Sequence, residues 1–147
     1  MRPLAEILDE INDHIIVEGR VCPTNGADPV AAADAATSLA GHKPIGNRWR
    51  ELSESPLELL THHIGHDLAY GPGNSFTPEK CASLAESLLS HSDTDSRWFT
   101  NNSELEAGPS DRLSSCSGMP ITDWTFDAAV IAVGPQNTLF LCFKAED

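Results

Sequence analysis

The residues of this chain best suited to chemistry are three histidines and an aspartate in the run Thr61-His62-His63-Ile64-Gly65-His66-Asp67. His62 and His66 are four residues apart, so on a helix their imidazoles face the same way and could hold one transition-metal ion, with His63 or Asp67 as a further ligand. That arrangement would suit a metal-dependent enzyme centred on His62, His66 and Asp67. It is also typical of an ordinary polar helix surface, and the chain has neither an HExxH motif nor a cysteine partner for the histidines. We therefore expect no bound metal and no cofactor.

Other catalytic patterns are weaker still. The chain has no GxSxG elbow for a nucleophilic serine, no phosphate-binding Walker loop and no GxGxxG turn. The four cysteines are widely separated and form no CxxC pair, which argues against a zinc ribbon and a thioredoxin-like site. We expect plain reduced thiols, and export of the protein would leave two disulfides as the alternative. These cysteines are Cys22, Cys81, Cys116 and Cys142.

The composition is strongly acidic. The chain carries 22 Asp and Glu against 9 Lys and Arg, a formal net charge of −13 over 147 residues. Such a charge disfavours direct nucleic-acid binding, which draws on clustered Lys and Arg, and favours a basic protein partner steered by complementary potential. Alternatively, the charged side chains simply keep exposed faces of the protein solvated and bind no partner. The candidate partner-binding residues combine charge and expected exposure with one aromatic anchor: Asp9, Glu10, Asp13, Asp93, Asp95, Glu104, Glu106 and Trp98.

The length and hydrophobic content predict one folded domain over residues 1–147. Acids interrupt every apolar run of the N-terminal segment, so it is not typical of a secretory signal, and no later stretch is long enough to cross a bilayer. We expect a cytoplasmic protein without membrane contact.

Helical spacing of apolar residues is clearest near the N-terminus. Leu4, Ile7, Leu8, Ile11 and Ile15 predict a first helix that Gly19 ends, followed by an irregular VCPTNGADP connection. A second, alanine-rich helix is predicted over Val30 to Ala40, with Asp28-Pro29 at its start and Gly41 at its end.

The histidine cluster falls on a predicted third helix. Ser55-Pro56-Leu57-Glu58 has the pattern of a capping box, and the helix is expected to run to about Tyr70, before Gly71-Pro72-Gly73. A fourth helix is predicted over Glu79 to His91, beginning at Thr77-Pro78. The predicted buried face of the third helix is formed by Leu57, Leu60, Ile64 and Leu68.

Residues 90 to 120 are rich in turn-forming residues and predict loops, with a short strand at Arg97 to Thr100. Two β-prone runs follow, Thr125 to Val133 and Thr138 to Phe143, and the intervening Gly134-Pro135-Gln136-Asn137 predicts a hairpin. Both faces of the first run are apolar, which favours a central strand. The fold class is therefore α+β: about four helices packed with a small antiparallel sheet that includes the C-terminal hairpin. A homodimer is a further alternative, in which the apolar hairpin of one copy pairs with that of a second copy.

The C-terminal segment resembles a known class of ending. The similarity lies in the run Ile121-Thr122-Asp123-Trp124-Thr125-Phe126-Asp127-Ala128-Ala129-Val130-Ile131, which is followed by a hairpin and by Lys144-Ala145-Glu146-Asp147. This segment is similar to the end of small bacterial immunity proteins from polymorphic toxin systems. The resemblance implies a cytoplasmic protein that blocks a cognate toxin, with acidic residues over a basic active site. Lys144 departs from a purely acidic tail. The expected function is non-enzymatic neutralisation of a toxin by occlusion of its active site; the alternatives are a phage-type anti-defence or nuclease inhibitor that mimics nucleic-acid charge, and the metal-dependent enzyme above.

Overall fold

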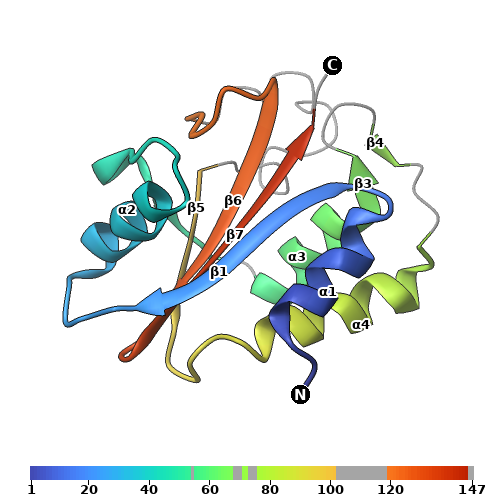
Figure 1. Cartoon of the computed structure of the whole chain (residues 1–147), viewed down its shortest axis with the longest axis horizontal. Coiled ribbons are helices and arrows are strands. Elements are labelled where there is room, and N and C mark those ends of the chain that lie inside the picture. The colour runs from blue at the N-terminus through green and yellow to red at the C-terminus, as the bar shows by residue number, and fades with distance from the viewer. Residues whose placement is uncertain (54, 68–70, 73–75, 102–118, 146–147) are drawn as a thin grey trace.

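A five-stranded antiparallel sheet lies between helices on both of its faces (Figure 1). The computed structural model describes residues 1–53, 55–67, 71–72, 76–101 and 119–145. The strand order is β1 (Ile16–Pro23), β7 (Asn137–Ala145), β6 (Phe126–Val133), β5 (Arg97–Thr100) and β2 (Arg50–Glu51). Helices α1 (Leu4–Asn12), α3 (Pro56–Gly65) and α4 (Pro78–Leu89) cover one face, and α2 (Pro29–Leu39) covers the other. The predicted α+β class, with four α-helices in the described residues, is confirmed.

The C-terminal hairpin forms the centre of the sheet, as its two apolar faces predict. Val130 pairs with Leu141, β6 lies between β7 and β5, and β7 lies between β1 and β6. Alternate residues of β6 serve different cores because successive strand side chains point to opposite faces. Ala128, Val130 and Ala132 pack beneath α1, α3 and α4, and Ala129, Ile131 and Val133 pack beneath α2. The hairpin strands already have partners on both sides within the chain.

The N-terminal segment differs from the prediction of one helix running to Ile15. Helix α1 ends at Asn12, and Ile16–Pro23 is an edge strand rather than a helix end and an irregular connection. The Asn12 side chain causes the change of structure: its Nδ2 donates to the carbonyls of Leu8 and Val17, both at 2.8 Å, and its Oδ1 accepts from the amide of Val17 at 3.0 Å. The β-branched residues after it favour the extended chain.

Gly19 therefore has a different role from the predicted helix end. It lies in β1, at a point where helix α1 and strand β7 both come close. A Cβ atom at this position would lie 2.8 Å from Cδ2 of Leu141 and 3.3 Å from Cδ1 of Leu8. Only glycine allows this approach without displacing its neighbours.

Helices α2 and α4 begin where the sequence predicts. The Asp28 side chain accepts from the amide of Ala31, and the Thr77 hydroxyl accepts from the amide of Lys80, each at 3.1 Å. These caps satisfy amides that have no partner within the helix. After α2 the chain turns at Gly41, whose φ of +83° suits glycine.

Helix α3 begins at Pro56 as predicted, but its N-terminal cap and its C-terminal end differ from the prediction. Ser55 occupies the N-cap, but its side chain makes no capping hydrogen bond, so the predicted capping box is wrong. The helix ends at Gly65 instead of near Tyr70, because His66 is extended and pairs with Pro72 between β3 (His66–Asp67) and β4 (Gly71–Pro72). The buried side chains of α3 are Leu59, Leu60, His63 and Ile64; Leu57 is half-buried, and Leu68 and Tyr70 lie outside the described residues.

The remaining short elements connect α2 to the sheet. A single 3₁₀ turn, η1 (Gly46–Arg48), precedes β2. Among the described residues, no helix combines the length and apolar character that a membrane span needs.

Candidate functional site

The histidine cluster splits into one buried residue and a half-buried pair. His63 is buried, with its ring centroid 5.2 Å from that of Phe143 beneath the sheet. The rings of His62 and His66 stack with centroids 4.1 Å apart, and Nδ1 of His66 donates to the carbonyl oxygen of His62 at 2.9 Å. His66 is the C-cap residue of α3, and its ring lies on the same side as that of His62, as the four-residue spacing predicts.

The cluster does not assemble a metal site in the part of the chain that is described. No group of three or more His, Cys, Asp or Glu side chains there is placed to hold one ion. His63 is buried against Phe143, with its ring edge-on to that of His62 at a centroid distance of 5.8 Å, and the side chain of Asp67 is not among those described.

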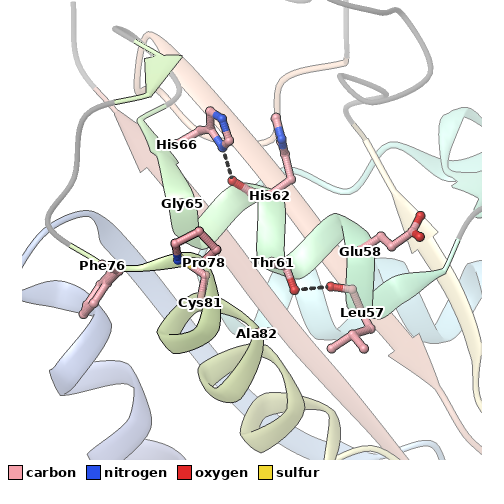
Figure 2. Close-up of a pocket in the computed structure, with 10 residues that line it drawn as sticks. All are labelled: Leu57, Glu58, Thr61, His62, Gly65, His66, Phe76, Pro78, Cys81 and Ala82. Carbon is pink, nitrogen blue, oxygen red and sulfur yellow. Dashed lines mark hydrogen bonds between the residues drawn. The ribbon is translucent and has the colours of Figure 1, made fainter.

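The stacked histidines border a pocket between α3 and α4, which we call the α3–α4 pocket (Figure 2). It encloses about 540 Å³ and is lined by Leu57, Glu58, Thr61, His62, Gly65, His66, Phe76, Pro78, Cys81 and Ala82. Small residues create the space: Gly65 has no side chain, and Ala82 leaves room on the facing helix. The Thr61 hydroxyl is already used, since it donates to the carbonyl of Leu57 at 2.6 Å. The pocket therefore presents a mainly apolar lining.

Cys81 contributes to this apolar character. Burial raises the pKa of its thiol, so the side chain stays neutral near pH 7. The structure contains free thiols at Cys22, Cys81 and Cys142, and Cys116 lies outside the described residues. Burial likewise raises the pKa of Cys142, which lies in the core beneath α2. Neither buried cysteine has the lowered pKa of a catalytic nucleophile.

The predicted acidic residues of α1 divide into bound and open groups. Glu10 lies between two cations, with Lys80 Nζ at 2.5 Å and Arg2 at 2.8 Å, and hydrogen bonds from Lys80 and then Arg2 lower the pKa of its carboxyl. Asp9 and Asp13 are exposed, and neither forms an ion pair with a described residue. Of the three, these two present free negative charge to a partner.

The second predicted acidic segment is divided in the same way. Oδ2 of Asp93 accepts from the amides of Gln136 and Asn137, both at 2.8 Å, and these bonds lower the pKa of its carboxyl. Asp93 thus fastens the chain after α4 to the β6–β7 turn. Asp95 is exposed, and Trp98 is half-buried against the core beneath α1, α3 and α4. Glu104 and Glu106 lie outside the described residues.

Helices α1 and α4 run antiparallel, which decides which acids become neighbours. Lys80, at the start of α4, meets Glu10 near the end of α1, whereas Nε2 of His91, after α4, lies 2.8 Å from the carbonyl of Arg2. Asp9 and Asp13 therefore lie towards the beginning of α4, and Asp95 follows its opposite end.

Three exposed acids that the sequence reasoning did not single out complete this layer. Glu58 lies on α3, and Glu79 and Glu86 lie on α4, all without an ion pair to a described residue. The sequence could have indicated the two acids of α4, because Glu79, Ala82 and Glu86 have the three- and four-residue spacing that places side chains on one helix face.

The face covered by α2 uses its carboxylates internally. Oδ1 of Asp34 accepts from the indole of Trp49 at 2.7 Å and from the amides of Ile45 and Gly46. Glu18 binds His42 and Lys144, while Asp123 pairs with Lys43 at 2.9 Å. Among the described residues, the exposed carboxylates without an ion pair lie mainly on the α1–α3–α4 layer; Asp28, at the start of α2, caps that helix.

Comparisons with known proteins give no relative: no family model, no curated protein and no solved structure matches this chain.

Proposed function

We propose that this chain is a non-enzymatic acidic binding protein that neutralises a cognate bacterial toxin by covering a basic active site. The partner would be a basic protein, met in the cytoplasm. The resemblance of the C-terminal segment to immunity proteins is the reason for proposing a toxin as the partner. The placement of the exposed acids is the reason for proposing that binding is electrostatic.

One observation carries the proposal. The α1–α3–α4 layer presents Asp9, Asp13, Glu58, Glu79 and Glu86 as exposed carboxylates without an ion pair among the described residues. Carboxylates that folding leaves open remain available to a cationic surface, and their summed potential accelerates encounter with it.

The test is isolation of the untagged protein from its native host at low ionic strength, with identification of any stoichiometric partner. A basic protein whose toxicity is relieved by this chain is the expected result.

The double variant Asp9→Asn, Asp13→Asn should associate with that partner more slowly than the parent protein at low salt, and this difference in rate should shrink as salt screens the charges.

Asp123→Asn is the control, because it removes an exposed carboxylate that already pairs with Lys43. A partner that is acidic, or an association rate that does not change with ionic strength, would contradict the proposal. Displacement of the partner by DNA would favour instead an inhibitor that mimics nucleic-acid charge.

A further inference from the structure

We propose that the α3–α4 pocket is the docking site for a basic amphipathic helix of the protein partner. Its apolar side chains would enter the pocket, and its Lys and Arg side chains would meet the acids around the rim. The inference deepens the proposed function and rests on it for the nature of the partner.

The lining provides the apolar part of the recognition. Leu57 and Thr61 from α3 face Pro78, Cys81 and Ala82 from α4, and Phe76 closes one end (Figure 2). A pocket of about 540 Å³ lies within the range of roughly 300–1,000 Å³ that ligand sites occupy. Helices that bind in such sites insert apolar anchors three or four residues apart.

The rim provides the charge. Glu58 lines the pocket from α3, and Glu79 and Glu86 lie three residues before and four residues after the lining residue Ala82 on α4. All three are exposed. The one lysine of α4, Lys80, is drawn to Glu10 on α1, so it does not neutralise this rim.

The pocket also connects to the open acids of α1. The ring of Phe76 lies edge-on to His14, with centroids 4.4 Å apart, and His14 directly follows Asp13. Negative charge therefore continues from the pocket towards the end of α1. His62 and His66 also line the pocket, and Nδ1 of His66 is already used, since it donates to the carbonyl oxygen of His62.

Charge complementarity selects a basic partner over a second copy of this chain. Each copy carries a net charge of −13, so docking one copy on the acidic rim of another brings like charges together. A helix rich in Lys and Arg removes that cost and neutralises the rim.

The experiment uses a fluorescein-labelled Leu/Lys peptide in amphipathic helical order, with a scrambled peptide of the same composition as its control. Fluorescence anisotropy with the full chain should show about tenfold tighter binding of the amphipathic peptide. Ala82→Leu, which fills the pocket, should weaken that binding about tenfold, as should Thr61→Leu from the opposite helix. Ala35→Leu, on the exposed side of α2, should have no effect.

The rim is tested by the triple variant Glu58→Gln, Glu79→Gln, Glu86→Gln. It should weaken peptide binding at low salt and differ little from the parent protein at high salt. Circular dichroism and urea unfolding of each variant distinguish loss of binding from loss of fold.

Equal binding of both peptides, or full binding by folded Ala82→Leu and Thr61→Leu proteins, would overturn the docking site. So would a dimer of the chain alone that Ala82→Leu abolishes. If the native partner binds these variants normally but binds Asp9→Asn, Asp13→Asn poorly, the pocket proposal fails and the proposed function stands. If the peptide occupies the pocket but the host yields no basic partner, the proposed function fails and the pocket remains a binding site for a basic amphipathic helix.

Discussion

At the scale of single residues, polar side chains decide several features of this fold. Asp127 is buried, and its Oδ2 accepts from the amide and hydroxyl of Thr122 at 2.9 and 2.8 Å and from the amide of Ile121 at 3.2 Å. Its Oδ1 accepts from Asn101 at 2.7 Å. One carboxylate therefore joins the start of β6 to the chain before it and to the end of β5.

Replacement of Asp127 by asparagine should lower the free energy of unfolding by about 2–3 kcal/mol, since an NH₂ group would face donors and charged hydrogen bonds would be lost. Urea denaturation measures the change. Asp123→Asn, whose side chain is 92% exposed, is the control and should shift stability by less than about 0.5 kcal/mol. Equal effects of the two substitutions would show that the buried network is not the cause.

Asn12 is the second decisive residue, because its three hydrogen bonds end α1 and begin β1. Asn12→Ala should cost about 1–2 kcal/mol in urea unfolding, the range for partly exposed hydrogen bonds. Asn47→Ala, an exposed asparagine in the 3₁₀ turn η1, should change little. A negligible loss for Asn12→Ala would mean that the β-branched segment ends the helix without it.

At the scale of elements, hydrogen bonds to the Asp93 carboxylate hold the α4–β5 connection against the β6–β7 turn. The turn approaches Asp93 so closely that a Cβ atom on Gly134 would lie 2.3 Å from Oδ2. Position 134 of the predicted hairpin turn therefore requires glycine because a side chain would collide with Asp93, and not because the backbone has a positive φ. The loop after α4 and the central hairpin are consequently coupled.

The coupling should depend on pH. Hydrogen bonds from Asn137 and Gln136 hold the pKa of Asp93 below the ordinary aspartate value of 3.8. A carboxyl whose pKa is lowered by folding stabilises the native state above its unfolded pKa, and this contribution is lost as the pH falls through the folded pKa. Asp93→Asn should therefore be less stable than the parent at pH 5–7, with the difference shrinking below about pH 4.

Urea midpoints of both proteins between pH 2 and 7 measure this effect. The exposed Asp95→Asn variant should show no comparable pH-dependent difference. A gap for Asp93→Asn that widens as the pH falls would contradict the expected sign.

At the scale of the whole molecule, the net charge of −13 opposes compaction. The ion pairs Arg2–Glu6, Arg2–Glu10 and Lys80–Glu10 offset part of it near the surface. Exposed pairs contribute little to stability, so repulsion among the open acids should dominate.

Raising NaCl from about 10 mM to about 100 mM shortens the screening length from about 30 Å to about 10 Å. The urea midpoint should rise over this interval. The Asp9→Asn, Asp13→Asn protein should show a smaller rise, because it starts with less repulsion. A midpoint that falls with salt would mean instead that surface ion pairs outweigh repulsion.

Much of the fold was predictable because its signals are local. The hairpin around Gly134, the strand at Arg97 to Thr100 and the caps at Asp28 and Thr77 depend on neighbouring residues, and all were found. The length of α1 was not predicted, because its apolar spacing continues into a strand. That strand gains its stability by pairing with β7, more than a hundred residues away.

The candidate site shows the same division. The sequence by itself determined the excess of acids, the histidine run and the central hairpin, since composition and periodicity do not depend on distant contacts. Only the tertiary structure decided which acids are open, because pairing of Glu10 with Lys80 and of Asp93 with the hairpin turn requires segments distant in the chain. The α3–α4 pocket likewise exists only because residues of α3, such as Gly65, and of α4, such as Ala82, line one space, a relation that helix packing creates and neither helix contains alone.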